Sequence, residues 1–225
     1  VTGVQTCALP ISMLMEGEPV GAIVVAWGEP GKIPDRLVHL LEAFAAQAVI
    51  AIENVRLFNE TKEALRRETA SANILRVISG SPTDVQPVFD SIVAAAVELI
   101  DCDKTFVIQC DDVSFWAVAR ADRTGVVGGL SGTRVQIDPQ ANFPSRVILG
   151  KSMLHLPDWN AIELPSWEKA IHASGGINAS LMIPLLRQGK CIGVLALQRT
   201  QAIAFNDKEI AIAHSFCDQA MIAIE

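Results

Sequence analysis

The chain has 225 residues, half of them hydrophobic, which is enough for one complete core and part of a second at roughly 100 to 200 residues per domain. Its formal net charge of −7 provides no basic surface for phosphate groups, which argues against nucleic acid and acidic membranes as partners. The longest apolar runs, 20–27 and 43–52, are too short to cross a bilayer, so we expect no membrane segment here.

Five cysteines are distributed along the chain without a CxxC pair and without a histidine at metal-ligand spacing. Each is most simply a small core residue in a reducing cytoplasm, so we expect a cytoplasmic protein without a bound metal. The first cysteine, Cys7, lies in residues 1–11, which resemble a sequencing adapter translated in one frame. We expect that these eleven residues do not belong to the natural protein.

An internal repeat organises the rest of the chain. Residues 16–26 and 188–198 share their glycines and their apolar run, and Gly21 and Gly193 are 172 positions apart. The same offset relates residues 50–53 to residues 222–225, both of which read Ile-Ala-Ile-Glu. Each copy predicts a strand, a tight turn, a second strand and an amphipathic helix. We therefore expect residues 12–54 to be the C-terminal remnant of a first domain, whose upstream strands are missing.

A long helix is predicted between the two copies, because residues 35–79 contain no glycine or proline. Part of it, residues 55–73, is the expected linker between the two domains. Its heptad seam predicts a coiled coil and a homodimer through the linker and terminal helices, and a single long helix packed on its own domain is the alternative. The seam consists of Ala48, Ala51, Val55, Phe58, Lys62, Leu65, Thr69 and Ala72.

Residues 74–225 predict a nearly complete second domain of the α+β class. Helices are expected at 84–100, 145–149, 165–174 and from residue 206 onward. Strands are expected at 105–109, 114–119, 152–156, 179–185 and 191–198, and the glycine-rich residues 124–138 predict a loop with a further short strand at 133–137.

The order of several short motifs in this domain is similar to that of the GAF domain family. The motifs are His155 to Asp158, Gly176 to Leu185, Cys191 to Leu197, Phe205 to Asp207 and Phe216 to Glu225. Residues 74–89 resemble the segment that precedes GAF domains in bacterial sensor histidine kinases and related cyclases. The resemblance implies a six-stranded antiparallel sheet with helices on both faces, preceded by the long linker helix. It also implies a pocket on one side of the sheet, in a tandem GAF fragment of such a signalling protein.

Large apolar side chains are the candidates for lining this pocket, because ligand sites are mostly apolar with few polar anchors. They are Phe106, Phe115, Trp116, Phe143, Met153, Trp159 and Trp167, with Ser180 as a polar anchor. A plain hydrophobic core is the alternative interpretation of the same residues.

The cofactor remains unassigned from the sequence. The family's bilin-binding members need a cysteine in the helical stretch after the third strand, where this chain has His172 but no cysteine, so no covalent bilin is expected. Haem would need His155 or His172 as its ligand and is not favoured. The Asn-Lys pair of cyclic-nucleotide-binding members is also missing, and Phe205 precedes residues that favour a helix cap instead.

We therefore predict a regulatory module, not an enzyme, because kinase phosphoacceptor and ATP-binding motifs are missing from the sequence. In this hypothesis a small ligand or a conformational input is passed through terminal helices to an output domain. A ligand-free GAF scaffold for dimerisation and spacing is the main alternative. A remote alternative is the GAF-fold reductase of free methionine sulfoxide, because Cys102, Cys110 and Cys191 could approach each other on adjacent strands. This alternative fails if Cys191 lies far from both of the other two cysteines.

Overall fold

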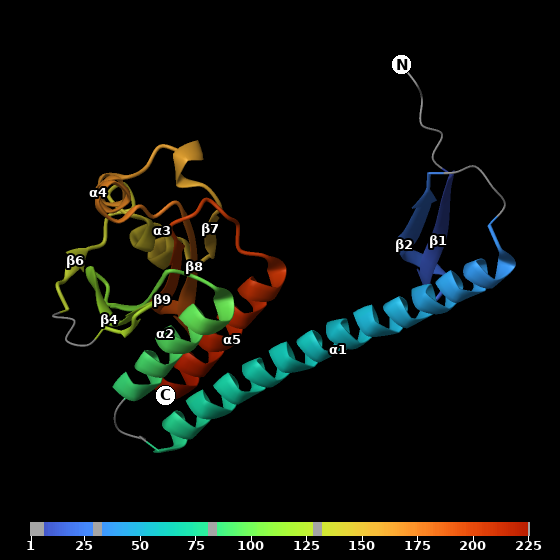
Figure 1. Cartoon of the computed structure of the whole chain (residues 1–225). Helices are drawn as coiled ribbons and strands as arrows, with labels where there is room; N and C mark the ends of the chain where they lie inside the picture. The colour runs from blue at the N-terminus through green and yellow to red at the C-terminus, as the bar shows by residue number, and fades with distance from the viewer. Residues whose placement is uncertain (1–6, 29–32, 81–84, 128–131, 225) are drawn as a thin grey trace. The chain divides into compact units, whose positions relative to one another are not determined.

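A computed structural model of the chain describes residues 7–28, 33–80, 85–127 and 132–224 (Figure 1). The chain divides into two compact units, residues 1–65 and residues 66–225. The boundary falls inside the segment 55–73 that the sequence predicts as a linker, and helix α1 (Asp35–Gly80) passes through it. Of the adapter-like residues, 1–6 lie outside the described part, and 7–11 form the start of strand β1.

The first unit contains a two-stranded antiparallel hairpin of β1 (Cys7–Met15) and β2 (Glu18–Trp27). Both turn residues, Glu16 and Gly17, have positive φ angles of 53° and 91°, the backbone conformation that favours glycine in two-residue hairpin turns. Large apolar side chains remain exposed on the hairpin, including Leu14 at 55% and Val24 at 61%. A hairpin with so little buried surface has little stabilisation of its own.

The second copy of the sequence repeat forms a hairpin of strands β8 (Ala179–Arg187) and β9 (Lys190–Arg199). Its backbone resembles that of the β1–β2 hairpin. The turn residues Gln188 and Gly189 also have positive φ angles, of 49° and 79°. The pairing of β1 with β2 shifts register at Met13/Leu14, and that of β8 with β9 shifts at Leu185/Leu186, again 172 residues later. The two hairpins are therefore alike in turn and bulge.

The central part of α1 exposes many of its apolar residues, including Val55, Phe58 and Leu65 at 61%, 67% and 61%. These three belong to the predicted heptad seam. Residues Asp35–Ile74 also contain a window whose mean hydropathy of 1.3 makes this helix a candidate membrane span by length and composition. Core helices of soluble proteins and signal sequences pass the same test, so the window is weak support for a membrane location.

The second unit is built on an antiparallel sheet in the order β5-β4-β3-β9-β8-β7, with β6 pairing with β4. Its first strands are β3 (Lys104–Cys110), β4 (Ser114–Asp122), β5 (Gly125–Val126) and β6 (Val135–Gln136), and β7 is Leu154–Leu156. The sheet thus has seven strands where the family resemblance implies six. The difference arises in the glycine-rich segment, where two-residue strands pair with opposite ends of β4.

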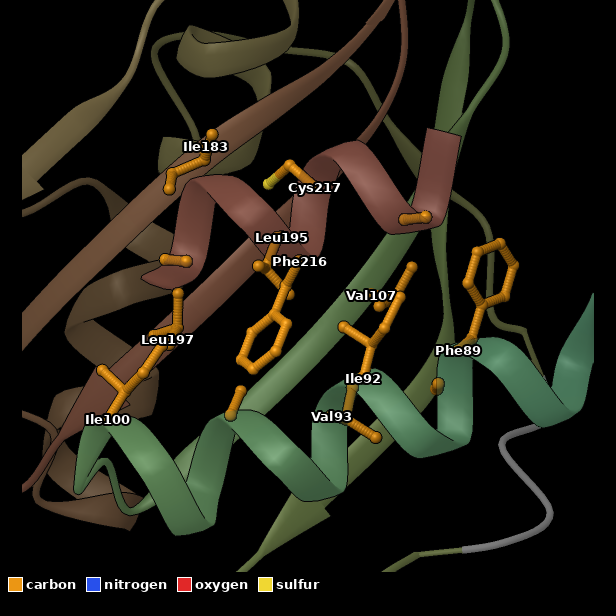
Figure 2. Close-up of a cluster of buried hydrophobic side chains, with 14 of the residues drawn as sticks. Phe89, Ile92, Val93, Ile100, Val107, Ile183, Leu195, Leu197, Phe216 and Cys217 are labelled. Carbon is orange, nitrogen blue, oxygen red and sulfur yellow. The ribbon is translucent and has the colours of Figure 1, made fainter. Parts of the chain in front are cut away.

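One face of this sheet is covered by helices α2 (Gln86–Ile100) and α5 (Asp207–Ile224), which lie side by side (Figure 1). Phe89 and Ile92 of α2 and Phe216 of α5 pack against alternate residues of the strands, among them Val107 and Leu195 (Figure 2). These side chains are at most 1% exposed. Strand alternation places Leu195 and Leu197 on this face and Val194 and Ala196 on the other.

The opposite face carries α3 (Phe143–Gly150), the 3₁₀ turn η1 (Trp159–Ala161) and α4 (Ser166–Gly175). A second buried cluster forms here, in which the rings of Phe143 and Trp159 meet edge to face with centroids 5.5 Å apart. The side chain of Asn142 caps α3 by accepting a hydrogen bond from the Ser145 N–H at 2.9 Å. Helices therefore cover both faces, as the sequence predicts.

Gly193 shows why one glycine of the repeat is needed in this sheet. A Cβ atom at this position would lie 2.3 Å from the Ile108 carbonyl oxygen of β3, which pairs with β9. The equivalent Gly21 has no such backbone neighbour, and its added Cβ would meet only the flexible end of Met13. Among the described residues, β2 has a pairing strand on one edge only, whereas β9 lies between β3 and β8.

Candidate functional site

A pocket of about 390 Å³ lies between the sheet and α4, on the face opposite α2 and α5. Its floor is formed by β3, β4, β8 and β9, and its wall by α4 with one residue of α3. The volume is within the usual range for small-molecule sites. Its lining includes four aromatic residues and two charged ones: Phe106, Phe115, Trp116, Trp167, Arg120 and Glu168.

Most of the lining is apolar, and one of its aromatic groups, Trp116, is held in place by a neighbour outside the lining. The guanidinium of Arg134 stacks on the Trp116 ring at 4.0 Å and also forms an ion pair with Asp111. The Asp111 carboxylate accepts backbone hydrogen bonds from Val113 and Ser114, which is the main reason why its pKa is held well below the usual range. The β3–β4 turn is thereby fixed, and with it the position of Trp116.

Glu168 is the most buried charged residue of the pocket, with 1% of its surface exposed. Its Oε1 accepts a hydrogen bond from the Phe143 N–H at 2.8 Å, at the start of α3. Its Oε2 has no hydrogen-bond partner among the described residues. Burial raises the pKa of this carboxyl to about 7, against the opposing effect of the Phe143 N–H and the Arg146 charge. The carboxyl can therefore change its protonation state near neutral pH.

Two cations, Lys104 of β3 and Arg120 of β4, line the same pocket. The Arg120 guanidinium lies 5.6 Å from the centre of the Phe106 ring and 3.5 Å from an Asp122 oxygen. Its Nε atom is buried and has no hydrogen-bond partner within the described residues. The pocket therefore combines an apolar body with one acidic and two basic groups.

The eight residues predicted to line a pocket are distributed over three environments. Phe106, Phe115, Trp116 and Trp167 line the pocket itself. Phe143, Trp159 and Ser180 are buried beside it, where the Trp159 Nε1–H donates to the Ser180 hydroxyl oxygen at 3.0 Å. Met153 is 42% exposed and lines a different hollow, next to α5.

The charged groups of the pocket were not among the residues predicted from the sequence to line it. Lys104, Arg120 and Glu168 are charged residues in an otherwise ordinary surface pattern, and no motif marks them. The alternation of strand β4 gives no signal for Arg120 either, because Val107 and Ile108 pair with Ala119 and Ala117, and this bulge reverses which residues of β4 face the pocket. Burial of Glu168 could be recognised only after α4 had been placed against α3.

Both histidines considered as haem ligands bond to the backbone outside the pocket. His155 Nε2 accepts a hydrogen bond from the Phe205 N–H at 3.0 Å, and His172 Nδ1 donates to the Ile177 carbonyl at 2.6 Å. Neither residue lines the pocket. Over the described part of the chain, no group of three or more His, Cys, Asp or Glu residues is placed to hold a metal ion.

Two of the three cysteines considered for reductase chemistry lie next to each other. The Cys110 thiol donates to the Cys191 carbonyl oxygen at 3.4 Å, and a hydrogen bond from Cys110 lowers the pKa of the Cys191 thiol. Cys102 lies in the other core, where burial raises its pKa to about 11. Cys110 and Cys191 are both outside the pocket lining. The thiol pair therefore has no direct contact with the concave site.

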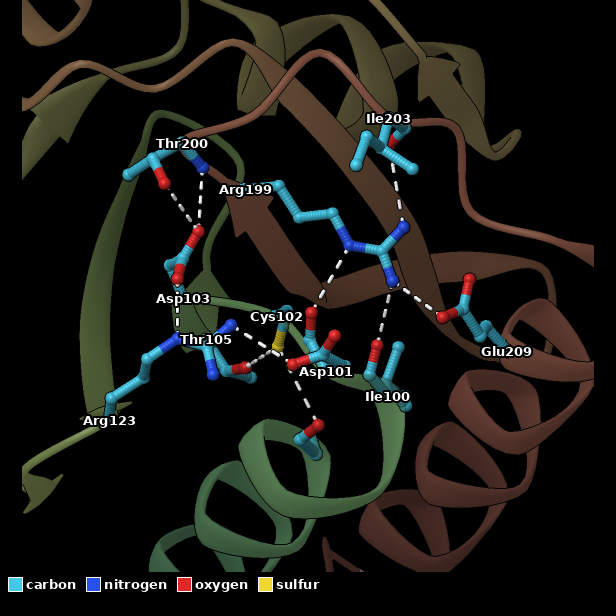
Figure 3. A network of polar contacts seen from close by, with 11 residues as sticks. Ile100, Asp101, Cys102, Asp103, Thr105, Arg123, Arg199, Thr200, Ile203 and Glu209 are labelled. Carbon is cyan, nitrogen blue, oxygen red and sulfur yellow. Dashed lines mark hydrogen bonds and ion pairs between the residues drawn. The ribbon is translucent and has the colours of Figure 1, made fainter.

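The strand that forms part of the pocket floor is also bonded to the terminal helix. Gln198 lines the pocket, and its neighbour Arg199 points to the opposite side of β9, where it donates to Glu209 of α5 at 2.5 Å (Figure 3). The same guanidinium donates to the carbonyls of Ile100 and Ala204 at 2.8 and 2.9 Å. Asn206 and Glu209 cap α5 reciprocally, with bonds of 2.8 and 3.0 Å.

Comparisons with known proteins agree on one family. The GAF domain family model matches residues 84–224. No curated protein matches the chain. Solved structures show the same fold at low identity, as in residues 122–287 of a methyl-accepting chemotaxis protein (21% identity, 69% of this chain and 94% of the other, TM-score 0.56).

Two further solved structures have functions that bear on the alternatives raised by the sequence. The phycocyanobilin-bound GAF domain of a cyanobacterial phytochrome is 18% identical, covering 70% of this chain and 93% of the other, with a TM-score of 0.57. The free methionine-R-sulfoxide reductase of Neisseria meningitidis, solved with its substrate, is 18% identical, covering 72% of this chain and 89% of the other, with a TM-score of 0.54. At these identities the likeness concerns the fold alone.

Proposed function

Since this chain belongs to the GAF domain family, we propose that it is the sensory part of a bacterial signalling protein and binds a small molecule in the pocket between the sheet and α4. The family's fold occurs in signalling proteins such as the chemotaxis protein and the phytochrome. The observation that carries the proposal is the pocket itself. A scaffold domain needs a filled core, whereas this domain has about 390 Å³ of open space with a buried carboxylate at its wall.

The output passes through the helices that end the domain. Gln198 and Arg199 are consecutive, so a ligand that moves the pocket floor also acts on the bonds between Arg199 and α5. Regulation requires that the ligand bind two conformations with different affinity, and a buried polar clamp of this kind is a suitable two-state element. The exposed apolar seam of α1 supports a homodimer as the form that carries the signal to a further domain.

Native mass spectrometry of the full chain, purified from bacterial cytosol, tests the proposal. We expect a dimer that carries the additional mass of a small molecule. Ala196→Phe, which fills the pocket floor, should lose this mass, whereas Val113→Phe, at an exposed position in the β3–β4 turn, should keep it. Equal bound mass in both variants would place the ligand elsewhere, and absence of any bound mass in the wild type would favour the scaffold.

An enzymatic role as a reductase has weaker support. The fold is shared with the Neisseria enzyme, and Cys110 and Cys191 are adjacent. However, neither thiol lines the pocket in which a substrate would bind, and Cys102 lies on the other face of the sheet. We therefore propose a binding module and not an enzyme.

A further inference from the structure

Two buried polar atoms of the pocket are left without partners, and they indicate what the ligand must supply. Glu168 Oε2 and Arg120 Nε accept and donate no hydrogen bond within the described part of the chain. Both residues line the pocket. An unsatisfied buried donor or acceptor is destabilising, and native proteins rarely keep one without a functional reason. Both atoms have almost no accessible surface, so the two side chains must rotate slightly before the atoms reach the pocket. A ligand that then pairs with both atoms removes this penalty on binding.

The acidic residue Glu168 and the basic residues Lys104 and Arg120 lie at opposite ends of the pocket. Glu168 lies in the first turn of α4, whereas the Lys104 ammonium lies at the last turn, 3.2 Å from where a Cβ atom of Gly175 would be. Arg120 of β4 pairs with Phe106 of β3, and Phe106 is two residues from Lys104 on that strand. Arg120 and Lys104 therefore lie near each other. Seven residues of α-helix separate Glu168 from Gly175, which corresponds to about 10 Å.

The space between these ends is apolar. Phe106, Ile108, Phe115 and Met182 form the floor, and Ile171 of α4 lies between the ends on the wall. The basic end suits an anionic group, because guanidinium and ammonium groups form charge-assisted hydrogen bonds with carboxylates. The acidic end suits a hydrogen-bond donor, because the free Oε2 of Glu168 can accept one more bond.

We propose that the pocket takes an elongated aromatic carboxylic acid, with its acidic group at Arg120 and Lys104 and a hydroxyl or N–H donor at Glu168. This inference rests on the proposed function, since it names the ligand class of the same pocket. A cationic ligand would be repelled by the two basic residues, and a purely apolar one would leave both unpartnered atoms as they are. The Asp122 carboxylate, which is 3.5 Å from Arg120, is the internal group with which the ligand competes.

A set of matched probes tests the ligand class by isothermal titration calorimetry on the full chain. The lead probe is 3-(4-hydroxyphenyl)propionate, which has a carboxylate and a phenolic donor at its two ends. Its 4-methoxy analogue lacks the donor, 4-propylphenol lacks the acid, and tyramine replaces the acid by an ammonium group. We expect the lead probe to bind roughly tenfold or more tightly than 4-propylphenol, and tyramine to bind more weakly than either.

Single substitutions test whether Arg120 binds the carboxylate end of the probe and whether Glu168 binds its hydroxyl end. Arg120→Met keeps the apolar stem and should weaken the lead probe roughly tenfold without affecting 4-propylphenol. Glu168→Gln should reduce the preference for the hydroxyl probe over its methoxy analogue. Arg123→Met, an exposed arginine next to the same strand and outside the lining, should change neither.

The outcomes separate this inference from the proposed function. If 4-propylphenol or tyramine binds as tightly as the acid, or if Arg120→Met leaves the acid unaffected, the ligand class is wrong and the pocket remains a sensor site. If none of the four probes binds while native mass spectrometry detects a bound compound, the ligand class is again wrong. If neither method detects any binding, both proposals are overturned.

Discussion

Gln198 and Arg199 are consecutive residues of β9 that serve opposite faces of the sheet: Gln198 lines the pocket, and the Arg199 guanidinium bonds to Glu209 at the start of α5 (Figure 3). The alternation of a strand makes this arrangement unavoidable once both residues are in β9. It also means that the pocket and the terminal helix share one short piece of backbone.

Removing the Arg199 side chain should destabilise the second unit. Arg199→Met removes the donor to Glu209 Oε1 and to the carbonyls of Ile100 and Ala204, and breaking a largely buried pair in this way costs about 3 kcal/mol. Urea denaturation measures the free energy of unfolding. Arg123→Met is the control, because its ion pairs with Asp101 and Asp103 are more exposed and its loss should change the free energy of unfolding much less. Equal losses in the two variants would contradict a special role for Arg199.

Among the buried residues of α5, Phe216 should be the one whose truncation lowers the free energy of unfolding most. Its ring is 1% exposed and lies in the buried cluster between α2 and the sheet, so Phe216→Ala leaves a cavity there (Figure 2). We expect a loss of about 3 to 5 kcal/mol in the free energy of unfolding. Leu149→Ala, at a position that is 57% exposed, should change it by less than about 0.5 kcal/mol.

Glu168 should make the stability of the protein depend on pH. Its pKa in the folded protein, about 7, is above the ordinary value of 4.5, so the folded state binds more protons between these pH values. Its stabilising contribution is fully present below about pH 4.5 and is lost as the pH rises through about 7. The total change is on the order of 2 to 3 kcal/mol.

Comparison with Glu168→Gln isolates this effect. The variant keeps an acceptor for the Phe143 N–H but cannot ionise. We expect its melting temperature to exceed that of the wild type increasingly between pH 5 and pH 8. A difference that stays constant over this range would show that Glu168 does not titrate there.

The α1 seam should determine the oligomeric state. Phe58 and Leu65 are 67% and 61% exposed and lie seven residues apart on the predicted seam. Phe58→Glu together with Leu65→Glu should convert a dimer into a monomer in sedimentation velocity experiments, because charges at seam positions oppose association. Leu57→Glu, which is also exposed but lies beside the seam, is the matched control. A monomeric wild type would refute the dimer.

Local patterns in the sequence determined the elements of this protein. The 3.6-residue and two-residue periods of apolar side chains predicted α2, α5, β8 and β9 within a few residues, and the repeat predicted two alike hairpins down to the turns at Gly17 and Gly189. These features depend on neighbours in the chain, which the sequence displays directly. The family's motifs then implied an antiparallel sheet with helices on both faces and a pocket on one side.

Only the tertiary structure decided which side chains face the pocket. Phe143 and Trp159 are as large and apolar as Phe106 and Trp116, but the first two fill the core because α3 and η1 are packed on the sheet there. Glu168 looks like a solvated helix residue until α4 is placed against α3, where desolvation and one N–H bond change its chemistry. Burial and the pairing of distant groups are properties of the packed molecule, and no local pattern of residues encodes them.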